Sequence, residues 1–269
     1  MSKSAFNENI VIITGASSGI GKALALQLAD EGTWIAVAAH RIERLKSVAA
    51  ECKQRGGRAF AVQTDVSDPL QCARLIDKTL AEYGRIDTLI NNAGVTMWSR
   101  FEDLQDLTVL DSIMQVNYFG SVYCTYYSLP YLKKTKGRIV VVSSLTGKTG
   151  VPTRSGYAAS KHALVGFFDT LRIEMSADGI SVTIAYPDFV ATETRARAYG
   201  SDGKPLGVSP VQEGRVMTAD ECARLILKAS ARRRREIVMG LRGRVGQYIR
   251  VFLPGLTDRI ARRAIERGR

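Results

Sequence analysis

The chain contains few of the side chains that build disulfide frameworks and metal sites. Four of its 269 residues are cysteines and two are histidines. The cysteines are widely separated and no two of them form a CxxC pair. They are Cys52, Cys72, Cys124 and Cys222. Isolated small thiols are more typical of helix interiors than of cross-links or metal ligands, so we expect neither a structural disulfide nor a metal site.

Long apolar segments are also absent from the sequence. No uncharged apolar run reaches the length of about 18 residues that marks a membrane-spanning helix. The opening residues, MSKSAFNEN, lead into a short apolar run that ends at Thr14 and Gly15. This run is too short for the apolar region of a secretory signal. We therefore expect a cytoplasmic protein.

Acidic residues are scarce toward the end of the chain. Residues 232–269 contain twelve arginines, no lysine and three acids, which accounts for +9 of the formal net charge of +12. All the preceding residues together carry only +3. The basic character is therefore a property of the tail and not of the whole chain.

The tail, residues 243–269, combines this charge with two apolar stripes at helical spacing. The stripes consist of Val245, Ile249 and Phe252, followed by Leu256, Ile260 and Ala264. Pro254 and Gly255 separate them, which predicts two short helices with a bend. Such a segment either lies on an anionic membrane surface or packs against its own domain or a second subunit. The sequence contains no nucleic-acid motif, and we expect no nucleic-acid partner.

Short apolar, β-branched segments alternate with longer helical patterns in the rest of the chain. The strand-like segments are residues 10–14, 34–39, 58–65, 86–91, 137–144, 180–187 and 236–240. The two longest helical patterns cover about residues 104–134 and 155–178. Apolar strands that alternate with helices are typical of a parallel sheet covered on both faces.

These patterns predict an α/β fold with one domain. We expect a Rossmann-type, doubly wound parallel sheet of about seven strands in residues 1–242, with the tail as a C-terminal helical extension. One segment, residues 191–215, is irregular and rich in glycine, proline and serine. An irregular segment of this length is often a lid or a binding loop.

The first expected strand runs directly into TGASSGIG, residues 14–21. Gly15 permits a tight turn. Gly19 and Gly21 allow the backbone to come close to a phosphate and the following helix to come close to the strand. The helix that follows presents its positive N-terminus to such a phosphate. The glycine spacing differs from the common G-x-G-x-x-G, so the motif indicates nucleotide binding mainly through its position after the first strand.

A second motif, SGYAASKHALVGF, begins the helical pattern at residues 155–178. Tyr157 and Lys161 are four residues apart, so a helix places both side chains on one face. A nearby ammonium favours the phenolate and lowers the pKa of a tyrosine. The pair is therefore either an acid–base device or an ordinary aromatic beside a surface lysine.

Taken together, five motifs resemble the classical short-chain dehydrogenases/reductases over about residues 8–240. They are TGASSGIG, NNAG at residues 91–94, Asn117 in VNYFG, Ser144 in VVVSS, and Tyr157 with Lys161 in YAASK. Ser144 precedes Tyr157 by thirteen residues, as in that family. The segment GKTGVPTRSGYAASKHALVGFFDTLR is most similar to the branch of 11-beta-hydroxysteroid dehydrogenases and dehydrogenase/reductase member seven proteins.

The resemblance implies a catalytic set of four residues. Tyr157 would be the general acid and base, and Lys161 would lower its pKa and bind the nicotinamide ribose. Ser144 would bind the substrate oxygen, and Asn117 would hold a water that relays protons to Lys161. The other interpretations are that Ser144 caps the next turn and that Asn117 is a buried amide bonded to backbone.

The resemblance also implies a nicotinamide cofactor. Ala39 stands where NAD-using members have an aspartate, and His40 and Arg41 follow it. A permanent cation there favours NADP(H) over NAD(H), unless Arg41 is only a solvated residue that opens a helix. The expected cofactor-binding residues are Gly15, Ser17, Ser18, Gly19, Ile20, Gly21, His40, Arg41, Asp65, Val66, Asn92, Ala93, Gly94, Tyr157, Lys161, Pro187, Val190 and Thr192.

One position departs from the family pattern, because Asp188 follows Pro187 where the family usually has glycine. The residues leave its role open.

We expect an NADP(H)-dependent oxidoreductase that interconverts a secondary alcohol and a ketone, with a hydrophobic small-molecule substrate. Residues 95–101 and 191–215 would line the substrate pocket, and the chain would form a homodimer or homotetramer. One alternative function is a nucleotide-sensing binding protein on the same fold that performs no chemistry. Another is a basic scaffold at a membrane surface.

Overall fold

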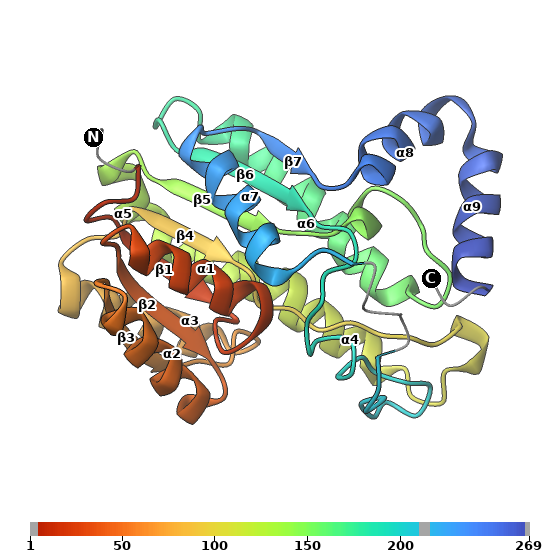
Figure 1. Cartoon of the computed structure of the whole chain (residues 1–269), viewed down its shortest axis with the longest axis horizontal. Helices are drawn as coiled ribbons and strands as arrows, with labels where there is room; N and C mark the ends of the chain where they lie inside the picture. The colour runs from red at the N-terminus through yellow and green to blue at the C-terminus, as the bar shows by residue number, and fades with distance from the viewer. Residues whose placement is uncertain (1–4, 210–215, 267–269) are drawn as a thin grey trace.

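The computed structural model describes residues 5–209 and 216–266, and a seven-stranded sheet forms its centre (Figure 1). Its strands are β1 (Ile10–Thr14), β2 (Trp34–Ala39), β3 (Arg58–Gln63), β4 (Thr88–Asn91), β5 (Arg138–Val142), β6 (Ser181–Tyr186) and β7 (Glu236–Val238). The order across the sheet is β3-β2-β1-β4-β5-β6-β7, and every pairing is parallel. The predicted doubly wound α/β fold is thereby confirmed.

The chain winds outward from β1 in two directions, which fixes where a ligand can bind. Strand β1 pairs with β2 through Ile10 and Trp34, and with β4 through Val11 and Thr88. The order of strands therefore reverses between β1 and β4. In open parallel sheets the ligand crevice lies beyond the carboxyl ends of the strands at such a reversal.

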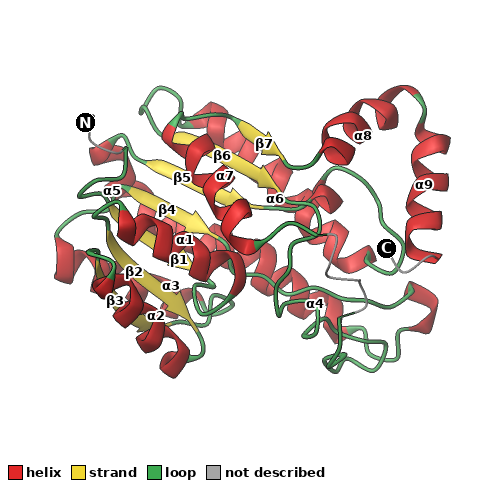
Figure 2. Cartoon of the chain, viewed as in Figure 1, coloured by secondary structure: helices red, strands yellow, loops and turns green. Residues whose placement is uncertain are grey.

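Helices cover both faces of the sheet, because every strand carries apolar side chains on both sides (Figure 2). One layer consists of α1 (Gly19–Asp30), α2 (Ile42–Gln54) and α7 (Ala219–Ala231). The opposite layer consists of α3 (Pro69–Tyr83), α5 (Gly120–Thr135) and α6 (Ser155–Glu174). The four cysteines of the chain lie buried and free in these layers. The core therefore consists of two apolar layers on either side of a buried sheet.

Local sequence signals set the limits of several elements. Helix α3 begins where the Asp68 carboxylate accepts hydrogen bonds from the Leu70 and Gln71 N–H groups, and it ends at Gly84 with a left-handed φ of 80°. Strand β3 ends at Gln63, two residues earlier than expected. Asp65 instead forms a turn in which its carboxylate accepts hydrogen bonds from Ser67.

The helix expected over residues 104–134 is not continuous. The structure has α4 (Thr108–Met114), then a wider π-helical turn, η2 (Gln115–Phe119), and then α5. The turn surrounds Asn117, whose side chain bonds both backbone groups of Val95. Helix α6 begins at Ser155 as expected but ends at Glu174, and the chain turns at Gly179, where φ is 72°.

The irregular segment expected at residues 191–215 contains isolated bridges instead of helices or strands over its described part. Tyr199 bridges to Met97 and to Pro205, which holds this segment against the chain after β4. Residues 210–215 lie outside the described residues.

Two helices extend from the end of the sheet after β7, α8 (Leu241–Phe252) and α9 (Pro254–Glu266) (Figure 1). Several side chains of the predicted stripes are exposed, with 47% of Val245, 77% of Phe252 and 52% of Ile260 accessible to solvent. Within residues 5–209 and 216–266, no helix combines the length and the apolar character that crossing a membrane requires.

Candidate active site

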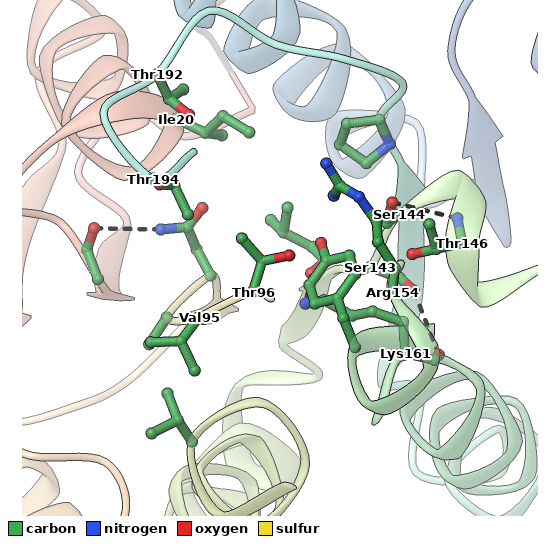
Figure 3. Close-up of a pocket in the computed structure, with 18 of the residues that line it drawn as sticks. Ile20, Val95, Thr96, Ser143, Ser144, Thr146, Arg154, Lys161, Thr192 and Thr194 are labelled. Atoms are coloured by element: carbon green, nitrogen blue, oxygen red, sulfur yellow. Dashed lines mark hydrogen bonds between the residues drawn. The ribbon is translucent and has the colours of Figure 1, made fainter. Parts of the chain in front are cut away.

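A cavity of about 1080 Å³ opens at the carboxyl ends of the strands (Figure 3). Its walls contain the residues that directly follow β1, β4 and β6, namely Gly15, Asn92 and Pro187. Helix α6 and the turn η3 (Leu145–Gly147) form the wall that carries Ser144, Tyr157 and Lys161. The cavity therefore occupies the crevice that the strand order predicts.

The glycine-rich turn is packed so closely that two of its glycines cannot be replaced without displacement. Gly15 has a φ of +66°, and a Cβ on it would lie 2.7 Å from the Cα of Ala93. A Cβ on Gly21 would lie 2.4 Å from the carbonyl oxygen of Gly15. Thr14 joins this turn to the end of β4, because its hydroxyl accepts hydrogen bonds from the N–H groups of Asn92 and Ala93.

The structure brings most of the predicted site residues to the cavity. The predicted residues that line it are Gly15, Ser17, Ser18, Ile20, His40, Arg41, Asp65, Val66, Asn92, Ala93, Gly94, Ser144, Tyr157, Lys161, Pro187, Val190 and Thr192. Gly19 and Gly21 do not line it, but a Cβ on Gly19 would lie 3.0 Å from the Thr192 side chain and one on Gly21 would meet the Gly15 carbonyl. Asn117 does not line it either, since it is fully buried.

A cluster of cations surrounds the rim near the glycine-rich turn. The Arg41 guanidinium lies 3.1 Å from the Ser17 hydroxyl and 3.4 Å from that of Ser18. Arg44 and Arg197 both pair with Glu193. Burial, followed by repulsion from Arg44, lowers the pKa of Arg41. An anionic group at this rim would relieve that repulsion.

Lys161 is buried at the base of the cavity and is 3% exposed. Its ammonium donates one hydrogen bond, of 2.9 Å, to the carbonyl oxygen of Val142 at the end of β5. Burial lowers the pKa of Lys161 to about 8. This side chain can therefore change charge close to neutral pH.

Tyr157 is half-buried one turn before Lys161 on α6, with its ring 5.7 Å from the Lys161 ammonium. Burial raises the pKa of Tyr157, and this effect outweighs the opposing effects of the Arg154 charge and a hydrogen bond with Ser144. The Ser144 hydroxyl also accepts a 3.2 Å hydrogen bond from the Thr146 N–H. Tyr157 is thus held protonated beside a serine hydroxyl, an arrangement suited to donating a proton.

The Asn117 side chain is fully used within the protein. Its carbonyl oxygen accepts a 2.8 Å hydrogen bond from the Val95 N–H, and its amide donates to the Val95 carbonyl and the Ser160 hydroxyl. Gly94 fits between Asn117 and Lys161, since a Cβ on it would lie 3.1 Å from the Asn117 amide oxygen. Asn117 therefore holds the segment that follows β4, at Gly94 and Val95, beside Lys161.

Several cavity residues were not anticipated as site residues from the sequence. Arg154 is buried one turn before Tyr157, and its guanidinium packs on Trp98 and Phe189. Gly243, Gln247 and other tail residues also form part of the wall. The sequence signal for Arg154 was its position at the head of α6 beside Tyr157, whereas nothing in the apolar stripes of the tail indicated a cavity.

The short chain dehydrogenase family model matches residues 9–201. This chain belongs to the short chain dehydrogenase family, whose members are oxidoreductases that act on hydroxyl groups. The matched residues include both the glycine-rich turn and the Tyr157–Lys161 pair. The recognition made from the motifs is confirmed.

The chain is similar to curated relatives and to a solved structure. The chain is 45% identical to the 11-beta-hydroxysteroid dehydrogenase-like 2 protein of Arabidopsis thaliana, over 72% of this chain and 64% of that protein. It is 34% identical to the Dehydrogenase/reductase SDR family protein 7-like of Dictyostelium discoideum, over 95% of this chain and 81% of that protein. The chain thus spans about two thirds of the length of the first relative and more of the second.

The alcohol dehydrogenase of the archaeon Thermococcus sibiricus, solved in complex with 5-hydroxy-NADP, is similar in structure, with a TM-score of 0.74 and 27% identity. The similarity covers 86% of this chain and 95% of that one. A nicotinamide dinucleotide is therefore the kind of cofactor that a chain of this architecture accommodates.

Proposed function

We propose that this chain is an NADP(H)-dependent oxidoreductase that interconverts a secondary alcohol and a ketone. The observation that carries the proposal is the convergence of Ser144, Tyr157 and Lys161 on one wall of a cavity whose other wall is a glycine-rich turn. A proton donor and a dinucleotide cradle on facing walls are what hydride transfer to a carbonyl requires.

The residues of the cradle fit a dinucleotide. Gly15 and Gly21 leave no room for side chains against Ala93 and the Gly15 carbonyl, and this close packing keeps the turn tight beside the cavity in which a pyrophosphate would bind. Asp65 and Val66 would contact the adenine, and the segment Asn92–Gly94 would run along its ribose. Pro187, Val190 and Thr192 would hold the carboxamide, and Lys161 the nicotinamide ribose. When bound, the nicotinamide supplies or accepts the hydride.

Tyr157 would transfer the proton at the substrate oxygen. In the direction of reduction it gives its phenol proton to the carbonyl oxygen, and in the direction of oxidation it takes a proton from the alcohol. Ser144 would donate a hydrogen bond to the same oxygen as charge develops on it. The Asn117 side chain already bonds Val95 and Ser160. We therefore propose that the backbone carbonyl of Asn117, and not its side chain, would hold the water that relays protons to Lys161.

Arg41 supports the preference for NADP(H) over NAD(H). Position 39 holds alanine and not an acidic residue that would repel a phosphate. The Arg41 guanidinium reaches the hydroxyls of Ser17 and Ser18 in the glycine-rich turn. A 2′-phosphate would accept hydrogen bonds from Arg41 at this rim. His40, which lines the cavity beside it, would contact the same part of the cofactor.

The arrangement of the chain is part of the proposal. Residues 1–242 would form the catalytic domain, with residues 191–215 over the substrate, and residues 243–269 would be a separate helical tail. We propose a cytoplasmic homodimer or homotetramer whose tail packs on a partner subunit or binds an anionic membrane surface. The small-molecule substrate would be largely apolar, since Val151, Phe189 and Leu145 line the cavity beside Ser144.

An assay of NADPH consumption with a panel of steroid, retinoid, acyl and sugar ketones tests the proposed function. Turnover of any ketone, together with the loss of turnover in Tyr157→Phe, supports it. NADPH binding without turnover of the whole panel would favour the nucleotide-sensing alternative. Arg41→Ala completes the test, since a reduced preference for NADPH over NADH is expected.

A further inference from the structure

We propose that Arg154 forms an anion subsite and that the substrate carries a carboxylate a few bonds from the reacting carbon. The inference rests on the proposed function, because it names the class of substrate that the same cavity would take. It assigns to Arg154 the recognition of the carboxylate and leaves the proton transfer to Tyr157.

The first support for this subsite is a buried charge without a counter-ion. Arg154 is only 7% exposed, and its Nε and one terminal nitrogen have no hydrogen-bond partner. No carboxylate within the described part of the chain forms an ion pair with it. A buried charge is costly unless it is paired and hydrogen-bonded. A bound anion would supply what the protein does not.

Aromatic rings hold the guanidinium in place without using its hydrogen-bonding capacity. The guanidinium carbon lies 4.3 Å from the centre of the Trp98 ring and 5.6 Å from that of Phe189. Stacked rings satisfy the flat faces of the group, and its N–H donors point outward along the edge. The edge formed by Nε and this terminal nitrogen has no partner and is covered in this structure, so a planar oxyanion that enters the cavity would reach it with two parallel hydrogen bonds after a small rotation of the side chain.

Charged residues of both signs line the cavity, Asp111 and Asp188 among them, and the cation that acts on Arg154 is Arg195. Arg195 is a second buried arginine of the same cavity, and its repulsion adds to burial in lowering the pKa of Arg154. Lys148 lies on the cavity wall as well, but Glu236 already pairs with it at 2.9 Å. A carboxylate beside Arg154 would therefore relieve repulsion between two buried cations.

The position of Arg154 fixes where the carboxylate would lie on the substrate. Its guanidinium is 5.8 Å from the centre of the Tyr157 ring, and Figure 3 shows the side chain extending from α6 past Ser144 toward the open cavity. A substrate whose carbonyl meets Tyr157 and Ser144 would bring a carboxylate to Arg154 only if the two groups are close. Oxo acids and hydroxy acids in which the two groups are a few bonds apart, and whose remaining carbons are apolar, meet this condition and also suit the apolar wall beside Ser144.

The test compares oxo acids with their methyl esters, which keep the ketone and remove the charge. The probes are acetoacetate, levulinate and benzoylacetate, each paired with its ester and assayed with NADPH. For the wild-type enzyme we expect kcat/KM for the best acid to exceed that for its ester. In Arg154→Met this preference should fall by about 10- to 150-fold, through a higher KM for the acid. Arg154→Lys should restore part of it.

A matched control separates this subsite from the general positive charge of the cavity. Arg250 lines the same cavity from the exposed surface of α8, and Arg250→Met removes one cation without touching the Arg154 site. The acid-to-ester ratio should be unchanged in this variant. Thermal unfolding and NADPH binding of each variant show whether its fold is intact.

The inference is overturned if wild-type enzyme shows no preference for any acid, or if Arg154→Met lowers acid and ester turnover equally. Calorimetric binding of the same acids to NADP⁺-saturated protein gives a readout that does not need turnover. Turnover of ketones without a preference for acids would contradict the anion subsite but would still support the proposed function. Acid binding that Arg154→Met abolishes, with no turnover of any probe, supports the subsite and counts against the proposed function.

Discussion

Among single residues of the cavity, Lys161 is one whose burial opposes folding. Its ammonium is 3% exposed, its one hydrogen bond goes to Val142, and burial lowers its pKa from 10.5 to about 8. A group that is costly in the folded protein and still placed beside Tyr157 is typical of a functional site.

The lowered pKa of Lys161 predicts a stability change that depends on pH. Because the unfolded chain holds this proton up to a higher pH than the folded one, Lys161 destabilises the fold fully below about pH 8. The penalty fades as the pH rises toward 10.5. Lys161→Met should therefore stabilise the cofactor-free protein more at pH 7 than at pH 10, and its melting temperature should rise more at pH 7. The gain in the free energy of unfolding should differ between the two pH values by on the order of 2 kcal/mol.

Lys46→Met is the control for this experiment, because Lys46 is exposed and pairs with Glu43 on α2. Its effect on the melting temperature should be small and nearly equal at both pH values. A Lys161→Met effect that is the same at pH 7 and pH 10 would contradict the burial argument. Activity should be lost in this variant at either pH.

Arg41 predicts a change in cofactor preference at the same scale. Loss of a charge-assisted contact with phosphate in Arg41→Ala should weaken NADPH binding by about 10- to 150-fold and leave NADH binding little changed. Fluorescence titration of both cofactors measures the ratio. Arg55→Ala is a matched control, because Arg55 pairs with Asp30 away from the cavity. An unchanged ratio in Arg41→Ala would remove this residue from the phosphate site.

The elements show where sequence patterns are sufficient and where they are not. Apolar strand runs and the turn residues between them predicted every strand of the sheet, with errors of a few residues at their ends. The interruption at η2 was not predicted, because the apolar spacing of residues 104–134 is compatible with one helix. The wide turn depends on the contact between Asn117 and Val95, which are distant in sequence.

The tail is the element whose surroundings the sequence left open. Its two helices were expected, but their position at the cavity was not, because an apolar stripe does not specify its partner. In the structure one part of the tail lines the cavity and another part is exposed to solvent. Gly246 and Gln247 line the cavity, while Val251 and Phe252 are 72% and 77% exposed.

Removal of residues 243–269 should leave NADPH binding intact, because the glycine-rich turn, Arg41 and Lys161 all lie upstream. Ketone turnover should fall, since one wall of the cavity is lost. Sedimentation of full-length and truncated protein, with and without anionic vesicles, tests the exposed stripe. We expect only the full-length chain to bind vesicles or to form the larger assembly. Identical behaviour of both forms in both assays would mean that the stripe has neither role.

A glycine on α8 tests the wall without deleting it. A Cβ on Gly243 would lie 2.6 Å from the Leu145 side chain, whereas a Cβ on Gly166, an exposed residue of α6 away from the cavity lining, would meet nothing within 4 Å. Gly243→Val should therefore raise the KM for ketones with little change in the affinity for NADPH. Gly166→Val also places a β-branched residue inside a helix and serves as the control. Equal KM values in the two variants would show that α8 does not shape the substrate site.

At the scale of the whole molecule, the fold and most residues around the glycine-rich turn that line the cavity were predictable, whereas the residues of the opposite part of the cavity were not. The fold follows from the alternation of elements, and the cradle from short motifs that act through local backbone geometry. Arg154, Trp98 and Phe189 meet only through tertiary contacts, so spacing along the chain could not join them.

The central claim is that Tyr157 donates the proton during NADPH-dependent reduction of a ketone. Single-turnover oxidation of bound NADPH by the best ketone of the panel, followed by fluorescence in wild type and Tyr157→Phe, tests it most directly. The account predicts equal NADPH affinity in the two proteins and a turnover rate about 100- to 10,000-fold lower in Tyr157→Phe. A variant that retains more than about a tenth of the wild-type rate would contradict it.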